Sequence, residues 1–365
     1  MTDLDTCQPK VTIVIATYNR PDVLGLTIKS VLLQTESSWK LLVIGDSCDA
    51  RTQSLMDTFD DPRIKYINLS ERCAEQSGPN SVGLLLAETD YVALLNHDDL
   101  WLPDHLQKAL AELQKTGASL FVGRSAFCYR MLARENGQTR PFFLEISLLQ
   151  RKLYYAYLAA NYMYEPSSSW VMRRPLINAA GVWRSTRNLY RTSLQDWLLR
   201  AWRAGATLCQ SEAVTVLKFN THHQGSASQN AAGGTGQYNW GNTEQAAMFD
   251  MLANCSPEQM RQHIAHDLSS QPPEGLIARD PFKLEQPPPS RLMNYLGVLI
   301  LSTPAAWVYR FTGLDGFNLY AKLCGMPKGR NMAKVVAARV GETLPPPYDL
   351  QKLVASARVE LNKNV

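Results

Sequence analysis

The first third of the chain alternates short apolar runs rich in β-branched residues with amphipathic stretches, and this alternation constrains the fold most. Each run is apolar at successive positions, which predicts strands buried on both faces. Such strands, joined by amphipathic helices, are typical of an α/β fold in which helices cover both faces of a mostly parallel sheet. The predicted strands are Val11–Thr17, Leu41–Asp46, Ile64–Leu69, Tyr91–Asn96 and Ser119–Cys128, and the predicted helices are Arg20–Leu32, Ser81–Glu88 and Pro103–Lys115.

Composition limits the class of protein. The 365 residues are 45% hydrophobic, enough for one large domain or two ordinary ones, and this excludes a disordered or collagen-like chain. The seven cysteines are scattered and never form a C-x-x-C pair, which excludes a disulfide framework and favours a reducing compartment. The polar segment Met1–Lys10 contains no apolar signal-peptide core. We therefore expect a cytoplasmic protein.

Shifts in composition divide the chain into three regions. The α/β pattern belongs to residues 1–230. A loop and helical linker at 231–289 is rich first in Gly and then in Pro, and its prolines near Gln271–Pro273 and Gln286–Pro289 interrupt regular structure. Residues 290–365 form a basic, aromatic region for which we expect helices.

Three carboxylates follow predicted strands at one edge of the sheet. Asp46 ends the second strand, and Asp98 and Asp99 follow the fourth. Ligands of parallel sheets bind at the carboxyl ends of the strands. Adjacent carboxylates need a cation or hydrogen-bond donors, and their oxygens suit Mg²⁺ or Mn²⁺. The alternative is a solvated turn in which Asp98 or Asp99 caps the next helix.

Four segments together carry a resemblance to a known family. They are VTIVIATYNR at Val11–Arg20, LVIGDSCD at Leu42–Asp49, NSVGL at Asn80–Leu84 leading into YVALLNHDDLW at Tyr91–Trp101, and SLQDWLLR at Ser193–Arg200. In this order and spacing, over about residues 10–230, the chain resembles the inverting family 2 glycosyltransferases. The resemblance implies that residues 1–230 form a catalytic domain with the GT-A fold, a Rossmann-like α/β sheet.

The resemblance also implies a site for a nucleotide-sugar donor. In the family, the loop after the first strand, the Asp after the second and the D-x-D motif hold the nucleotide, and D-x-D also binds a divalent metal. Asn96 replaces the first Asp of that motif, so metal binding must depend on the two carboxylates that remain. By match, the donor-binding residues are Thr17, Tyr18, Arg20, Asp46, Asn80 and Asp98, and the ligands of Mn²⁺ or Mg²⁺ are Asp98 and Asp99.

A second departure concerns the catalytic base. The family usually has a Glu-Asp pair where this chain has Gln195–Asp196, so the resemblance implies Asp196 as the single general base. A positioned carboxylate that takes the proton of a sugar hydroxyl contributes about 10²- to 10⁴-fold to the rate. The residues alone leave another role open, because Ser193–Asp196 opens an amphipathic helix that Asp196 could cap.

Two histidines follow the predicted strand Ala213–Lys218. Family members often place a His shortly after the base-bearing helix, where it completes the metal shell or contacts the diphosphate. His223, which precedes Gln224–Ser226, matches this position better than His222 and becomes the third metal ligand by resemblance. The alternative is an ordinary surface histidine.

The resemblance places acceptor-binding residues in Ser167–Arg174. The candidates are Ser168, Ser169 and Trp170, with Trp197 and Trp183 as further sugar-stacking platforms. The alternative is that these aromatic side chains belong to the core. Arg173 and Arg174 either meet a diphosphate or are solvated.

The C-terminal region carries the positive charge of the chain. Residues 290–365 contain ten basic and four acidic residues, whereas the whole chain has a net charge of only +4. The apolar segment Leu292–Tyr309 is short for a membrane span and contains Pro304. Aromatic residues followed by basic ones predict in-plane binding to a membrane surface. The alternative is a helical subdomain that packs on the catalytic domain or forms a dimer.

These observations predict an inverting, metal-dependent glycosyltransferase that moves a sugar from a nucleotide sugar, UDP-sugar favoured, to a glycan or lipid-linked acceptor. Surface polysaccharide synthesis at the inner face of a membrane is the expected setting, and a homo-oligomer stays open. The alternative is a non-catalytic nucleotide-sugar or glycan-binding module on the same fold. TYNRPD stands where a dinucleotide oxidoreductase would have G-x-G-x-x-G, and the distribution of charge argues against nucleic acid.

Overall fold

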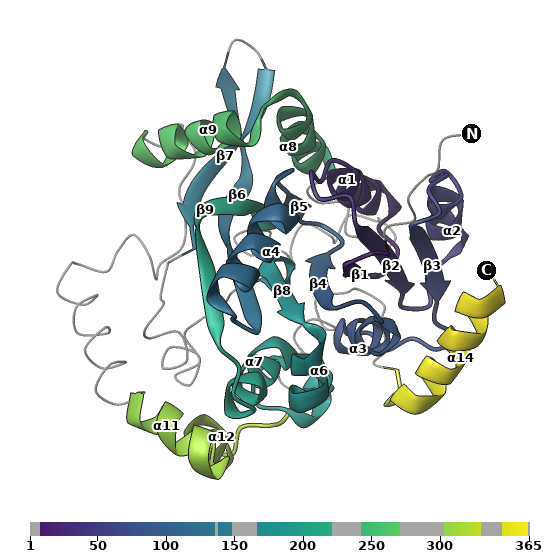
Figure 1. Ribbon diagram of the computed structural model, residues 1–365, viewed down its shortest axis with the longest axis vertical. Coiled ribbons are helices and arrows are strands. Elements are labelled where there is room, and N and C mark those ends of the chain that lie inside the picture. Colours follow the sequence, from purple (N-terminus) through teal and green to yellow (C-terminus); the bar gives the residue numbers. More distant parts are fainter. Residues whose placement is uncertain are drawn as a thin grey trace.

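A mixed β-sheet forms the centre of the molecule (Figure 1). The computed structural model describes residues 8–135, 138–147, 166–220, 242–270, 303–329 and 345–363. Within them, nine strands form one sheet in the order β3-β2-β1-β4-β8-β6-β9-β5, and β7 pairs with β6.

Four parallel strands make up the N-terminal half of the sheet. They are β1 (Val11–Thr17), β2 (Trp39–Gly45), β3 (Ile64–Asn68) and β4 (Tyr91–Asn96). The register pairs Thr17 with Gly45 and Ala16 with Asn96, so these strands end at the same edge. The predicted parallel strands and their common carboxyl edge are thus confirmed.

The other half of the sheet is mixed. Its strands are β5 (Leu100–Trp101), β6 (Leu120–Glu135), β7 (Gln138–Ile146), β8 (Trp170–Arg173) and β9 (Leu208–Asn220). Strand β8 pairs antiparallel with both β4 and β6 and so joins the two halves. The sequence had indicated only a mixed segment there, because four residues are too few to show a period.

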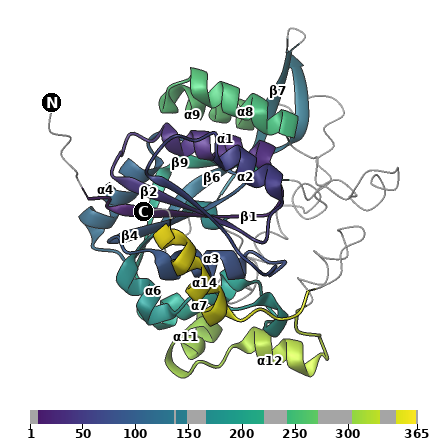
Figure 2. The same cartoon turned by 90° about the vertical axis from the view of Figure 1, so that its right-hand side faces the viewer.

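Helices cover both faces of the sheet, as predicted (Figure 2). Alternate side chains of β1 point to opposite faces. Val14 packs in one buried cluster, whereas Ile13 and Ile15 pack in the other. Helix α3 (Ser77–Leu86), α6 (Arg174–Ala180), α7 (Ser193–Arg203) and α14 (Leu350–Lys363) share the cluster of Val14, and α1 (Pro21–Leu32), α2 (Ala50–Met56) and α4 (His105–Thr116) share the other. A Cβ on Gly83 of α3 would lie 2.2 Å from Val14, so this close helix–strand approach requires glycine.

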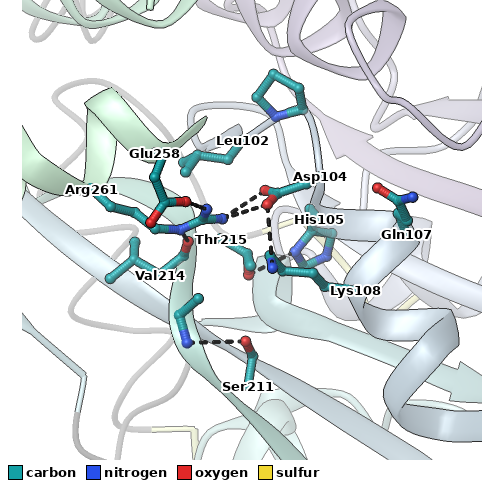
Figure 3. Close-up of polar contacts among 12 residues, drawn as sticks. Leu102, Asp104, His105, Gln107, Lys108, Ser211, Val214, Thr215, Glu258 and Arg261 are labelled. Atoms are coloured by element: carbon teal, nitrogen blue, oxygen red, sulfur yellow. Dashed lines mark hydrogen bonds and ion pairs between the residues drawn. The ribbon is translucent and has the colours of Figure 1, made fainter. Parts of the chain in front are cut away.

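Two further helices pack beside the mixed half. They are α8 (Asn242–Asn254) and α9 (Pro257–Ser269), and short 3₁₀ turns occupy Ser167–Ser169 and Thr186–Asn188. Figure 3 shows how Arg261 of α9 donates to the Asp104 carboxylate at 2.8 and 2.6 Å and to the carbonyl of Val214 at 2.9 Å. The same figure shows His105 bonded to Thr215, and burial lowers the pKa of His105 to about 3. This clasp ties α9 to α4 and β9.

The C-terminal helices pack on the α/β domain. Helix α11 (Thr303–Thr312) lies against α7, where Trp307 packs edge-on against Trp202. Helix α12 (Gly316–Leu323) is held through its N-cap Asp315, which accepts from Arg191 at 2.7 and 2.8 Å. Helix α14 lies against α3 and β3. No helix in the part of the chain that the structure describes is long and apolar enough to cross a membrane. Most of Leu292–Tyr309 lies outside that part.

Candidate active site

The loop after β1 meets the loop after β4 at the carboxyl edge of the sheet. A guanidinium nitrogen of Arg20 lies 3.0 Å from a carboxylate oxygen of Asp98. Beside this ion pair, the His97 ring and the Thr17 hydroxyl are 3.1 Å apart. The structure therefore brings together three residues that the sequence assigned to donor binding, Thr17, Arg20 and Asp98.

The adjacent carboxylates Asp98 and Asp99 have different environments. The Asp99 side chain is fully buried. It accepts hydrogen bonds from Ser168 at 2.5 Å and Asn96 at 2.9 Å, and the Lys218 ammonium lies 3.2 Å away. The Asp98 side chain remains 29% exposed. Only Asp98 therefore presents a carboxylate toward the edge of the sheet.

Electrostatics separates the two groups further. Burial and the nearby negative charge of Asp98 raise the pKa of Asp99, against the effect of Lys218. Burial would also raise the pKa of Asp98, but the positive charges of His97, Arg20 and Lys218 hold it well below its usual range. The pKa of Asp98 therefore lies below its usual range and that of Asp99 above it.

The carboxylate of Asp98 could be a ligand of a divalent metal ion. Mg²⁺ is commonly held by one or two carboxylates together with substrate phosphates and water. Among the residues that the structure describes, no group of three or more His, Cys, Asp and Glu side chains could hold a metal. The oxygens of Asp99 accept bonds from three side chains, so Asp98 is the more accessible of the two predicted metal ligands. His222 and His223 lie outside the described residues.

Asp46 organises the loop that follows β3. Its two carboxylate oxygens accept hydrogen bonds from the backbone N–H groups of Cys73 at 2.6 Å and Ala74 at 2.9 Å. Burial raises its pKa against these bonds. The loop then places the Arg72 guanidinium 3.8 Å above the ring of Tyr18. Asp46 thus holds a loop beside the predicted donor residues, and Asn80 is buried in α3.

Asp196 lies in the first turn of α7 but does not cap it. The N-cap is Thr192, whose hydroxyl accepts from the N–H of Gln195, while the Gln195 side chain accepts from the N–H of Thr192. The capping alternative for Asp196 is therefore wrong, since the box starts one residue earlier. Asp196 instead accepts from Arg200 at 2.8 Å, and Arg184 lies 3.7 Å away.

A chain of polar contacts joins the Asp46 loop to the start of α7. Glu75 accepts hydrogen bonds from the Ser185 hydroxyl and, at 2.8 Å, from the backbone N–H of Thr186. The Thr186 hydroxyl lies 2.7 Å from that of Ser193 in α7. The loop beside Tyr18 and the helix that carries Asp196 are therefore held in one framework.

The tryptophans assigned to the acceptor are core residues. Trp170, Trp183 and Trp197 are buried, and the rings of Trp170 and Trp197 stack with centroids 5.5 Å apart. Their faces are therefore not available to a sugar, and the stacking prediction is wrong. Ser169 is also buried and donates to the carbonyl of Pro166, while Ser168 donates to the Asp99 carboxylate.

Arg173 lies at the opposite edge of the sheet from Asp98. It is paired in register with Tyr91, at the beginning of β4, and donates to the carbonyls of Leu113 and Ala118. Arg174 is exposed next to it. A diphosphate contact is therefore excluded for Arg173 by its position, since Asp98 follows the other end of β4.

Lys218 is a residue that the sequence did not single out. It extends from β9 into the cluster of Asp98 and Asp99, although the chain segments are 119 residues apart. The one signal was a lysine within the apolar strand sequence VTVLKFN. Arg72 and Glu75 were missed as well, because their partners depend on how loops fold back.

We expect Lys218→Met to destabilise the fold strongly. Removing one partner of a buried ion pair leaves the other charge uncompensated and typically costs about 3–5 kcal/mol. Lys40→Met is a matched control, since the Lys40–Glu88 pair is solvent-exposed and contributes below about 1 kcal/mol. Urea denaturation measures both free energies of unfolding. Equal losses for the two variants would contradict the structural role of Lys218.

Comparison with known proteins identifies the class of this α/β domain. Residues 12–181 match the model of the family described as glycosyl transferase family 2. This part of the chain resembles that family, as the motifs implied. With its parallel strands and helices on both faces, the domain has the GT-A class of α/β fold.

Individual relatives match over part of their length. Succinoglycan biosynthesis protein ExoO from Rhizobium meliloti is 31% identical over 154 residues, which cover 39% of this chain and 44% of the relative. The UDP-Glc:alpha-D-GlcNAc-diphosphoundecaprenol beta-1,3-glucosyltransferase WfgD from Escherichia coli is 30% identical over 113 residues, which cover 31% and 44%. The chain thus spans less than half the length of these curated relatives. The solved structure of S. aureus TarS 1–349 in complex with UDP-GlcNAc is 12% identical, with a TM-score of 0.46 over 97% of this chain and 92% of that chain.

Proposed function

We propose that this protein is an inverting glycosyltransferase of polysaccharide synthesis. It transfers a sugar from a nucleotide-diphosphate sugar, UDP-sugar favoured, to a hydroxyl of a glycan or lipid-linked acceptor. The observation that carries the proposal is the charged, partly exposed Asp98 beside Arg20 at the carboxyl edge of a family 2 domain. The names of the relatives support the setting, since they refer to succinoglycan and to a diphosphoundecaprenol-linked acceptor.

The donor binds across the ends of β1 and β4. Thr17 and Tyr18 contact the nucleotide, Arg20 meets the diphosphate, and Asp46 acts through the loop that it holds. Asn80 contributes through α3, where its burial favours support over direct contact. When bound at Asp98, Mn²⁺ or Mg²⁺ acts as a Lewis acid toward the negative charge of the leaving diphosphate. His223 remains a proposed further ligand.

Asp196 is the proposed general base. Its carboxylate takes the proton of the acceptor hydroxyl while that oxygen forms a bond to the anomeric carbon of the donor. The bond from this carbon to the diphosphate breaks, and the electron pair leaves with the diphosphate, which inverts the configuration. Arg200 and Arg184 hold the Asp196 carboxylate in place.

Each of the three regions of the chain has its own role in the proposed reaction. Residues 1–230 form the catalytic domain, and 290–365 keep the enzyme on the inner face of a membrane. The segment 231–289 joins them, and its helices α8 and α9 pack against the sheet. The acceptor does not stack on Trp170, Trp183 or Trp197, since these tryptophans lie in the core.

A thermal-shift screen of UDP-, GDP- and dTDP-sugars with and without Mn²⁺ tests the proposal. We expect a UDP-sugar to raise the melting temperature more with Mn²⁺ than without it, because a ligand that binds only the folded state stabilises it. Transfer or hydrolysis of that donor is then measured directly. Tight binding with no turnover would support the non-catalytic binding module instead, and no binding of any donor would contradict both.

A further inference from the structure

The described part of the C-terminal region exposes an unusual density of apolar side chains. Seven of the twelve exposed large hydrophobic residues among those described lie between Trp307 and Leu323. Phe311, Leu314 and Leu323 are exposed by 75%, 68% and 78%. We call this set the α11–α12 surface; its members are Trp307, Val308, Phe311, Leu314, Leu319, Tyr320 and Leu323. Clustered exposed apolar residues mark a surface that binds a partner.

The helices that carry this surface are firmly attached. The side chain of Arg191 is only 2% exposed and forms two hydrogen bonds with Asp315, which also caps α12. The Arg191 guanidinium also lies 4.5 Å from the ring of Phe317. Ala306 and Ala321 are buried. The outward apolar side chains therefore belong to a fixed surface at the pole of the molecule shown in Figures 1 and 2.

Basic residues accompany the apolar ones. Residues 303–329 contain Arg310, Lys322 and Lys328 and a single acid, Asp315. Because Asp315 is neutralised by Arg191, the surface presents net positive charge. A partner with an apolar interior and an anionic boundary would satisfy both features.

We propose that the α11–α12 surface binds an anionic lipid bilayer. Phe311, Leu314 and Leu323 enter the boundary between headgroups and acyl chains, and the three cations contact anionic headgroups. A second copy of the chain fits less well. In a two-fold dimer the same surface meets itself, so two surfaces of the same positive charge would face each other.

The location of this surface defines the class of acceptor, and this step rests on the proposed function. Helix α11 packs on α7, the helix that carries Asp196. A bilayer on the outer side of α11 would therefore lie one helix away from the proposed base. This arrangement favours an acceptor whose sugar is attached to a lipid in the same membrane.

Vesicle flotation of the full chain tests the proposal. We expect flotation with vesicles of phosphatidylglycerol and phosphatidylcholine, and much less with phosphatidylcholine alone. Phe311→Ser with Leu323→Ser should reduce partitioning at least about tenfold, because two large side chains no longer leave water. The matched control is Leu85→Ser with Val359→Ser, which removes exposed apolar residues elsewhere and should leave flotation unchanged.

Three further measurements separate the remaining outcomes. Lys322→Gln with Lys328→Gln should weaken flotation and reduce its dependence on salt. Equal flotation of all variants, or no flotation of the native chain, would overturn the proposal. Loss of a dimer in the Phe311 and Leu323 variant, seen by size-exclusion chromatography, would assign the surface to self-association instead. Transfer to a soluble acceptor should persist in this variant, so a failed membrane test leaves the catalytic proposal intact.

Discussion

Asp196→Asn should reduce the turnover number for sugar transfer by about 10²- to 10⁴-fold, the usual contribution of a general base. An amide of the same shape cannot take the proton of the acceptor hydroxyl. Helix α7 should persist, because Thr192 and Gln195 cap it independently of Asp196. The measurement is steady-state transfer with the donor found by thermal shift, together with the binding constant of that donor.

The controls for Asp196 address charge and stability. Asp57→Asn removes an exposed carboxylate and should leave transfer unchanged. Loss of Asp196 also removes an acid from the first turn of a helix, which costs about 0.3–1 kcal/mol, while Arg200 keeps its hydrogen bonds to the carbonyls of Ala180 and Val182. This is too small to unfold an ordinary domain. If the variant turned over at the native rate, or if donor affinity fell as much as turnover, Asp196 would not be the base.

The parallel half of the sheet could be predicted from the sequence because its residues are buried on both faces. The predicted bounds of β1 and β4 match those observed, Val11–Thr17 and Tyr91–Asn96. Because β1 and β4 end at the same edge of the sheet, the sequence alone predicted that Asp98 lies near the loop of Arg20. The pattern was informative because a strand that is buried on both faces needs apolar residues at nearly every position.

The different roles of Asp98 and Asp99 could not be predicted. Two adjacent carboxylates look equivalent in a sequence, and only the partners of Asp99 distinguish them. Those partners are Ser168, from the 3₁₀ turn before β8, and Lys218, from β9, and they are 69 and 119 residues away. Neither carries a local signal, since a serine run resembles a loop and a lysine near a strand end resembles a solvated residue.

The tryptophans show a similar limit. A tryptophan near a predicted ligand site is consistent with sugar stacking and with the core, and hydropathy does not separate the two. Trp170 and Trp197 face the cluster under α7 because β8 enters the sheet beside β4. That pairing joins residues about 80 positions apart and depends on the fold as a whole.

Asp98→Asn should nearly abolish donor-dependent metal binding. Asp98 is the carboxylate of the pair that remains partly exposed, and the positive charges around it keep it ionised. An amide is a weaker ligand for a hard cation than a carboxylate. Since a metal ion supplies several kcal/mol of charge stabilisation, we expect transfer to fall by at least about 10²-fold. Mn²⁺ binding in the presence of the nucleotide, measured by electron paramagnetic resonance, gives a readout independent of turnover.

Asp99→Asn is the comparison variant for Asp98→Asn, because it distinguishes an effect on metal binding from an effect on stability. The Asp98 side chain is partly exposed, so Asp98→Asn should change the free energy of unfolding by less than about 1 kcal/mol. Asp99→Asn leaves Lys218 without its buried carboxylate and should cost about 3 kcal/mol or more. Metal affinity should therefore fall most in the Asp98 variant, and stability most in the Asp99 variant. The reverse order, with metal affinity lost at Asp99 and retained at Asp98, would mean that Asp99 leaves Lys218 and becomes the metal ligand when the donor binds.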